Sequence, residues 1–324
     1  MSAKERRLLD PALLPVSLWE PASQTLLLPP ILAKAYETVI DRHNLRALTE
    51  SRDPKNPPIG GLDKKKTDQH FAQAFDGSAA RAQLAITDPK DEVMRASNAF
   101  MQTLSGNRVC IADAPCGAGA AALAFLSVIA ELRSCQVLPR QPLDVRLIGA
   151  ELSEPARAYA SEIFEELQMF LESQAIFVEA EFIRWDILNK QDNATLNTRI
   201  AQSALPSDKR LLIVANFNGF LERKENRSKA EPQLEEIFRH ASTDSAMVIW
   251  IEPQMNHATK DGGLFSGIAR WVKEKWCRFA KVNSDGDFSK PFLLSESRFK
   301  SPLNPEKTHP VRLAVMRLDL ARSS

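Results

Sequence analysis

The stretch from Arg108 to Leu132 constrains the fold more than any other part of this 324-residue chain. A short apolar run, Val109–Ala112, ends at Asp113, and a tight turn with Gly117 and Gly119 leads into a long run of Ala, Leu and Ile. Strand, glycine turn and helix in this order open the nucleotide-binding unit of α/β domains. Glycines let a ligand approach the backbone because they lack a Cβ atom, and the N–H groups of the next helix suit a polar or anionic group.

The alternation of strand and helix continues through residues 106–324, which predicts one mostly parallel sheet. Strands are expected at Val109–Ala112, Val145–Ala150, Phe177–Ile183, Leu211–Phe217 and Ala246–Ile251, and helices at Ala120–Leu132, Glu154–Leu171, Pro232–His240 and Leu264–Trp276. Two runs of alternating polarity, Phe292–Lys300 and Val311–Leu320, have no helix between them and predict an antiparallel hairpin at the sheet edge. The expected fold class is therefore α/β: a Rossmann-like, seven-stranded, mostly parallel sheet with a terminal antiparallel hairpin.

Residues 1–105 are expected to form an N-terminal helical cap or lid ahead of that domain. Helices are predicted over residues 31–48, 68–86 and 91–104, and Gly77-Ser78 is expected to kink or break the second of them. Residues 1–30 are rich in proline and are expected to be irregular. Residues 50–66 are polar and end in three lysines, which indicates a loop or lid with a solvated run of charge.

The composition indicates a cytoplasmic protein with no metal and no membrane partner. The net charge of +1 excludes a polycation along the whole chain, although residues 206–324 carry more basic than acidic side chains. The four cysteines show no metal-ligand spacing and no disulfide density, as expected in a reducing compartment. No apolar run is long enough for a signal segment or a membrane span.

Acidic residues end the first three predicted strands of the domain. Asp113 ends the first strand, Glu151 the second, and Asp186 follows the third. Residues at the carboxyl ends of parallel strands face the ligand crevice. A carboxylate at the second position can accept two hydrogen bonds from a ribose diol, and one at the third can accept a bond from an adenine amino group. Three such acids beside a glycine turn predict a nucleoside-binding site.

The sequence D-A-P-C-G-A-G at residues 113–119 resembles the first motif of the class I S-adenosylmethionine-dependent methyltransferases, acid-x-Gly-x-Gly-x-Gly. The order of elements from residue 108 to residue 320 resembles that fold as well. The resemblance implies S-adenosylmethionine as the cofactor, with Asp113, Cys116, Gly117 and Gly119 around its methionine part, Glu151 at the ribose hydroxyls and Asp186 at the adenine.

Two features depart from that motif or fit another one. Pro115 stands in the place of the usual first glycine, which removes a backbone donor and stiffens the turn. The run from Gly117 to Ala122 also matches G-x-G-x-x-A, the fingerprint of enzymes that bind NAD. Asp113, between the strand and the glycines, would repel a pyrophosphate and attract an ammonium group. The charge therefore favours S-adenosylmethionine over NAD.

Candidates for catalysis follow the fourth and fifth predicted strands. Methyltransferases that act on amino groups often carry Asn/Asp-Pro-Pro-aromatic after the fourth strand. Asn216 and Asn218 have the amide chemistry here but lack the prolines, and Asn218-Gly219 also fits an ordinary turn. Glu252 and His257, after the fifth strand, are candidates for a general base, although a histidine in a polar loop is more often a surface residue.

The expected activity is transfer of a methyl group from S-adenosylmethionine to a nitrogen or an oxygen. The basic stretch Arg223–Lys229 is expected to form a loop over the same sheet edge, and it favours nucleic acid as the substrate. The alternative reading of this stretch is a solvated loop of mixed charge. A protein side chain or a small metabolite is the alternative substrate. The alternative function is that of a non-catalytic module that binds S-adenosylmethionine within a larger complex.

Overall fold

The computed structural model describes residues 6–51, 61–203, 209–221, 223–243, 245–254 and 292–320. Its elements follow the chain in this order: η1 (Pro11–Leu13), β1 (Trp19–Glu20), β2 (Thr25–Leu26), α1 (Pro30–Arg42), α2 (Arg46–Glu50), α3 (Lys64–Thr87), α4 (Met94–Gln102), η2 (Thr103–Ser105), β3 (Arg108–Asp113), α5 (Ala120–Ser134), β4 (Leu143–Glu151), α6 (Glu154–Ser173), β5 (Ile176–Arg184), α7 (Lys190–Ser203), β6 (Lys209–Ala215), α8 (Asn218–Leu221), α9 (Lys224–Ala241), β7 (Ala246–Pro253), β8 (Leu293–Lys300) and β9 (Thr308–Leu320).

The nine strands of the described residues form one sheet in the order β1-β2-β8-β9-β7-β6-β3-β4-β5. Strands β3 to β7 pair in parallel, and β9 runs antiparallel to both β7 and β8. The predicted parallel sheet and its antiparallel hairpin are confirmed, but the hairpin does not form the sheet edge. The expected number of seven strands is wrong, because β1 and β2 extend the sheet beyond β8. Each has only two residues, and both come from the proline-rich segment that was expected to be irregular.

The order of the strands places a topological switch point between β3 and β6. The chain steps from β3 to β4 and β5 on one side, and then returns to β6 and β7 on the other. Ligands of open α/β sheets bind at the carboxyl ends of the strands beside such a point, because the two neighbouring loops diverge there. The loops after β3 and β6 are therefore the parts of the fold where a site is expected.

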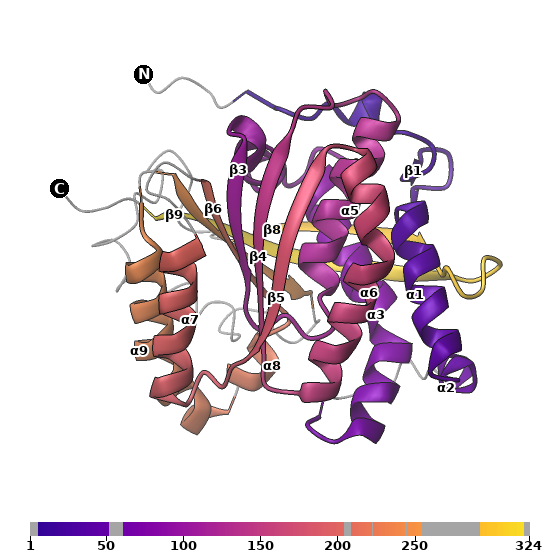
Figure 1. Cartoon of the computed structure of the whole chain (residues 1–324). Coiled ribbons are helices and arrows are strands. Elements are labelled where there is room, and N and C mark those ends of the chain that lie inside the picture. Colours follow the sequence, from indigo (N-terminus) through magenta and orange to yellow (C-terminus); the bar gives the residue numbers. More distant parts are fainter. Residues whose placement is uncertain are drawn as a thin grey trace.

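Helices cover both faces of the sheet, as Figure 1 shows, with α1, α3, α5 and α6 on one face and α7 and α9 on the other. Strand β3 supplies both hydrophobic cores by alternation: Val109 and Ile111 join the first core, and Cys110 and Ala112 join the second. Helix α5 is buried from Ala121 to Arg133, because it lies between the sheet and the neighbouring helices. The glycine turn is therefore placed between two buried elements, β3 and α5.

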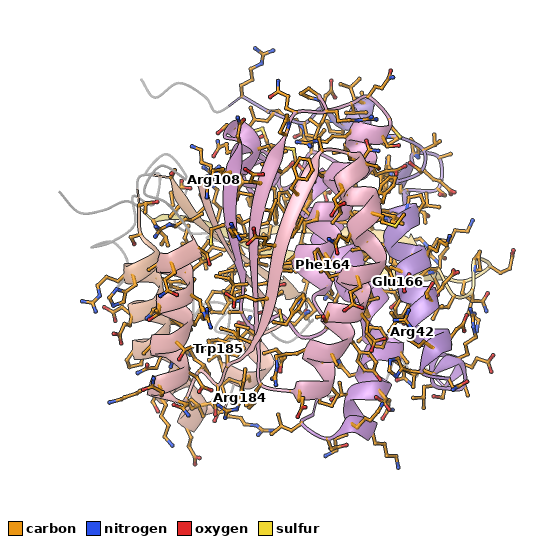
Figure 2. All side chains as sticks on the ribbon, viewed as in Figure 1. Arg42, Arg108, Phe164, Glu166, Arg184 and Trp185 are labelled. Carbon is orange, nitrogen blue, oxygen red and sulfur yellow. The ribbon has the colours of Figure 1, made fainter. Side chains whose placement is uncertain are left out.

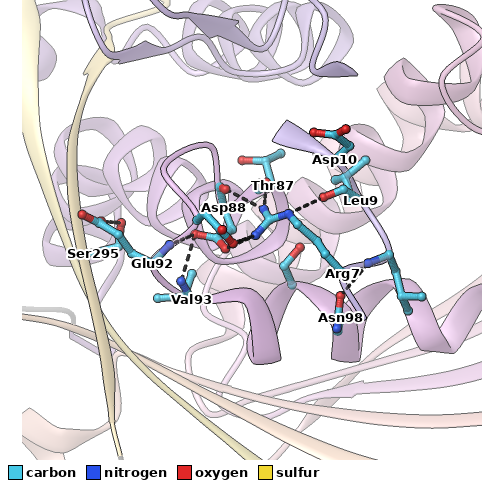
Figure 3. A network of polar contacts seen from close by, with 12 residues as sticks. Arg7, Leu9, Asp10, Thr87, Asp88, Glu92, Val93, Asn98 and Ser295 are labelled. Atoms are coloured by element: carbon cyan, nitrogen blue, oxygen red, sulfur yellow. Dashed lines mark hydrogen bonds and ion pairs between the residues drawn. The ribbon is translucent and has the colours of Figure 1, made fainter. Parts of the chain in front are cut away.

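The N-terminal segment shares the first core with the sheet, because residues of α1, α3 and α4 belong to the same cluster as those of β3 and β4. A polar network also ties its first residues to the turn between α3 and α4 (Figure 3). The guanidinium of Arg7 contacts the buried carboxylate of Asp88 at 2.8 Å, and the other carboxylate oxygen accepts from the backbone N–H groups of Glu92 and Val93. The domain boundary expected at residue 105 stays a prediction.

Several elements differ from the expectation. The first predicted helix is divided into α1 and α2, and α3 starts at Lys64 and continues through Gly77 without the expected break. Helix α7 was not predicted. The basic stretch expected as a loop is mostly the first turn and a half of α9, so the loop assignment of Arg223–Lys229 is wrong. The helix expected at Leu264–Trp276 lies outside the described residues. Within the part of the chain that the structure describes, we find no helix with the length and apolarity of a membrane span.

Candidate active site

Asp113 ends β3 at the switch point and is 1% exposed. Its Oδ2 accepts a hydrogen bond of 3.2 Å from the N–H of Ala122 in the first turn of α5, while Oδ1 is buried and has no partner among the described residues. Burial raises the pKa of Asp113 to about 7, although the hydrogen bond from Ala122 acts in the opposite direction and Glu151 adds to the rise. A buried acceptor without a partner costs free energy unless a ligand satisfies it.

The glycine turn folds over the end of the neighbouring strand. The Ala114–Pro115 peptide bond is cis, and the N–H of Cys116 donates to the carbonyl oxygen of Ala150 on β4 at 3.0 Å. Gly117 and Gly119 have φ values of +55° and +79°, which L side chains rarely adopt. A Cβ atom on Gly117 would meet nothing within 4 Å, so the turn faces open space at this residue. The backbone of the turn is therefore accessible to a ligand at Gly117, whereas Gly119 is buried.

Cys116 belongs to the turn and is buried. Burial raises the pKa of its thiol well above the usual value, and the nearby carboxyl groups of Asp113 and Glu151 raise it further. The thiol therefore stays protonated at neutral pH, and it can line a site without acting as a nucleophile.

Glu151 joins the glycine turn to the loop after β4. Its Oε2 accepts from the N–H of Gly117 at 3.1 Å, and its Oε1 accepts from the N–H of Ser153 at 2.8 Å. A carboxylate has about four acceptor positions, so capacity remains for two ribose hydroxyls. The expected neighbours Asp113, Cys116, Gly117, Gly119 and Glu151 thus lie together at one sheet edge.

Asp186 follows β5 at the same edge of the sheet. Its Oδ1 accepts from the N–H of Leu188 at 2.9 Å, and its own N–H donates to Asp192 at 2.9 Å. Trp185, beside it, is buried, and its indole N–H donates to Asn193 at 2.8 Å. Asp186 is partly exposed and keeps acceptor capacity for an amino group. These residues fit S-adenosylmethionine: a buried acid for its ammonium, a turn in which Gly117 and Gly119 have no side chain, and two further acids for the ribose and the adenine.

The segment after β6, a short loop that continues into α8, carries Asn216 and Asn218 in different environments. Asn216 is exposed and its amide is engaged at both ends, since Oδ1 accepts from Arg81 at 2.9 Å and Nδ2 donates to Ser78 at 3.2 Å. Asn218 is 6% exposed, and neither polar atom of its amide has a partner among the described residues. Asn218 is therefore the amide with capacity for an incoming group.

Glu252 supports this loop from the end of β7. The carboxylate is 2% exposed, and its Oε1 accepts from the N–H of Phe217 at 2.8 Å, the N–H of Asn218 at 3.0 Å and the indole N–H of Trp250 at 2.7 Å. Burial raises the pKa of Glu252 to about 7, and the three hydrogen bonds and the charge of Arg81 limit that rise. Because three donors share one oxygen, Glu252 has a structural role at the loop. It also remains a candidate for the general base. His257 lies outside the described residues.

Helix α3 lies beside the candidate site, which the sequence did not predict. From His70 to Thr87 only four of its residues are not buried, namely His70, Ala74, Ser78 and Arg81, and their spacing puts them on one stripe of the helix. The stripe reaches Asn216 at the end of β6, and Thr67, one turn earlier, lies with its hydroxyl 3.1 Å from that of Ser153 after β4. Burial lowers the pKa of His70, which keeps this imidazole neutral at neutral pH. The available sequence signal was weak, because the buried side of this helix also contains polar residues such as Gln73, Asp76 and Gln83.

A hollow of about 290 Å³ lies elsewhere, at the amino-terminal edge of the sheet. Its lining includes Arg108 and Asp144 at the starts of β3 and β4. Figure 2 shows Arg108 and Trp185 at opposite ends of the strands. The hollow is therefore separate from the candidate site at the carboxyl ends of the strands, which contains the buried unpartnered groups of Asp113 and Asn218.

No protein-family model and no curated protein matches the chain. Among solved structures it is similar to a putative class I S-adenosylmethionine-dependent methyltransferase from Listeria monocytogenes, with 12% identity over 92% of this chain and 88% of that chain and a TM-score of 0.37. A precorrin-6y C5,15-methyltransferase from Geobacter metallireducens shares 8% identity over 72% of this chain and 92% of that chain, with a TM-score of 0.33. Human N-acetylserotonin methyltransferase in complex with SAM shares 12% identity over 93% of this chain and 74% of that chain, with a TM-score of 0.29. The topology and the residues of the chain itself define the candidate site.

Proposed function

We propose that the chain is a methyltransferase that binds S-adenosylmethionine at the carboxyl ends of β3, β4 and β5. The observation that carries this proposal is Asp113, a buried acid with one unpartnered oxygen beside a turn that faces open space. An anionic carboxylate at this position opposes a pyrophosphate and attracts a cation. The ammonium of S-adenosylmethionine supplies that cation, and the bound cofactor would supply an electrophilic methyl group on a positively charged sulfur.

The chain's own residues would align the acceptor with that methyl group. Asn218 offers an amide oxygen and an amide nitrogen with no partner among the described residues, so it can orient a nitrogen or oxygen nucleophile. Alignment is the main requirement, because the methyl group is already activated. Glu252 and His257 remain proposed as bases for the proton that the acceptor loses, and Asn216 is proposed to support the loop.

Nucleic acid is the substrate class that we propose to test first. Arg223, Arg227 and Lys229 lie before or in the first turns of α9, directly after α8 and the loop of Asn218. Arg227 pairs with Glu231 one turn later, so part of this charge is balanced within the helix. The basic side chains of Arg223 and Lys229 suit contacts with a phosphate backbone.

Transfer of label from methyl-labelled S-adenosylmethionine to separated RNA, DNA, protein and small-molecule fractions of a cell extract tests this function. We expect label in the RNA or DNA fraction with the wild-type chain and none with Asp113→Asn, which removes the charge and keeps the shape. Label in the protein or small-molecule fraction would refute nucleic acid as the substrate class and would still support methyl transfer. Tight binding of the cofactor with no transfer to any fraction would indicate a non-catalytic module.

A further inference from the structure

The loop of Asn216 depends on a residue conformation that is unusual outside glycine. Asn216 has a φ of +55°, in the left-handed region. Its N–H donates to the carbonyl oxygen of Ile251 at 2.9 Å, which fixes the loop to the end of β7. A left-handed asparagine persists where surrounding contacts determine it, and such positions concentrate at functional sites.

Helix α3 supplies these surrounding contacts. The guanidinium of Arg81 donates through Nη1 to Oδ1 of Asn216 at 2.9 Å, and the hydroxyl of Ser78 accepts from Nδ2 at 3.2 Å. The two contacts engage both ends of one amide, so they fix its orientation as well as its position. Arg81 is itself anchored, since its Nε donates to the carbonyl oxygen of Arg312 on β9 at 3.2 Å.

Glu252, near the end of β7, holds the same loop through the N–H groups of Phe217 and Asn218. The contacts from α3 and from Glu252 thus hold the backbone on both sides of Phe217, and the amide of Asn218 that follows is buried without a partner among the described residues. Phe217 and Phe220 stack in parallel on it, with their ring centroids 5.3 Å apart. The loop is therefore held as a rigid unit.

We infer that Ser78 and Arg81 are positioning residues for methyl transfer: by holding the Asn216 amide, they fix the acceptor loop relative to the cofactor edge. The inference rests on the proposed function, because it assigns a role to α3 in the same reaction. Misplacing a reacting group by about 1 Å can lower a rate on the order of a hundredfold. We call the contacts of Ser78 and Arg81 with the Asn216 amide the clasp. Because the clasp acts on the loop and not on the cofactor, it can control turnover without contributing to cofactor binding.

Asn216→Gly separates positioning from backbone conformation. Glycine adopts the left-handed conformation without strain, so this variant keeps the turn and loses only the amide contacts. We expect a melting temperature equal to or above that of the wild type, unchanged binding of S-adenosylhomocysteine by calorimetry, and label transfer to the cell extract reduced by about tenfold or more. Transfer at the wild-type rate with this variant would overturn the inference.

Arg81→Met and Ser78→Ala test the clasp from the other side, with amide hydrogen exchange of residues 217–221 as a readout that needs no acceptor. We expect faster exchange in both variants, because the loop gains freedom. Arg46→Met is the matched control, since Arg46 is an exposed arginine that pairs with Asp41 away from the site. Exchange in Arg81→Met equal to that in Arg46→Met would refute the clasp. Absence of transfer in the wild type would refute the proposed function and, with it, a role of Ser78 and Arg81 in methyl transfer. The exchange result would still show separately whether α3 holds the loop.

Discussion

Asp113 is an acid that burial separates from water, and its pKa near 7 links both stability and binding to pH. The unfolded chain loses this proton near pH 4, whereas the folded chain keeps it until about pH 7. The free energy of unfolding therefore falls as the pH rises through this window, by on the order of 4 kcal/mol when ionisation is complete. Binding of a cationic amine has the opposite dependence, because it needs the ionised carboxylate.

Asp113→Asn tests this link. The variant is expected to be more stable than the wild type at about pH 8 and equally stable below about pH 4, because it has no proton to lose. Its affinity for S-adenosylhomocysteine should be lower, and it should not rise with pH through neutrality as the wild-type affinity does. Urea denaturation and calorimetry over this pH range measure both. Equal affinity of the two proteins at every pH would remove Asp113 from the site.

Gly117 and Gly119 differ in what a side chain would meet. At Gly117→Ala the new Cβ meets nothing within 4 Å, so the left-handed φ alone should lower the free energy of unfolding, by about 1 kcal/mol. At Gly119→Ala the Cβ lies 2.9 Å from Cδ1 of Leu123 and 3.3 Å from Cβ of Ala160, so the loss should be larger, about 2–3 kcal/mol. Urea denaturation measures the difference, and the reverse ranking would contradict this geometry.

At the scale of elements, Glu252 joins β7 to the loop between β6 and α8. Glu252→Ala leaves three N–H groups without their acceptor and should lower the free energy of unfolding by about 3 kcal/mol or more. Glu252→Gln keeps an acceptor oxygen and should cost clearly less. The exposed Glu296 on β8 provides the control, and its alanine variant should unfold as the wild type does. A loss in Glu252→Ala no larger than in the control would exclude the structural role.

Elements with strong periodicity or long apolar runs were predictable from the sequence, and elements set by tertiary contacts were not. The parallel strands and α5 follow from apolar runs between turns. Helix α7 was missed because its exposed side is polar and only Asn193, Leu196 and Ile200 are buried. The start of α9 looked like a loop because its first turns are charged. These two helices depend on packing against the sheet more than on their own pattern.

The candidate site divides in the same way. The glycine turn and the strand-end acids lie within single sequence motifs, so Asp113, Gly117 and Glu151 were accessible to sequence reasoning. The contact of Arg81 with Asn216 joins residues 135 positions apart. Nothing local marks such a pair, because it arises only when α3 packs beside the sheet.

At the scale of the whole molecule, the N-terminal segment and the sheet share one core, so they are expected to unfold together. Arg7→Met leaves the carboxylate of Asp88, whose side chain is 0% exposed, without its cationic partner. The expected loss in free energy of unfolding is about 3 kcal/mol. Arg46→Met, which breaks an exposed pair with Asp41, should cost less than about 1 kcal/mol. Equal losses, measured by urea denaturation, would show that the Arg7 network does not hold the segment.

The site at the carboxyl ends of β3, β4 and β5 is proposed to bind S-adenosylmethionine. The direct measurement is thermal unfolding of the wild-type chain and of Gly117→Val with S-adenosylhomocysteine or with NAD. We expect S-adenosylhomocysteine to raise the melting temperature of the wild type, by the equivalent of about 2.7 kcal/mol at roughly a hundred times its dissociation constant, and to leave a folded Gly117→Val unchanged. A rise with NAD and none with S-adenosylhomocysteine would contradict the claim.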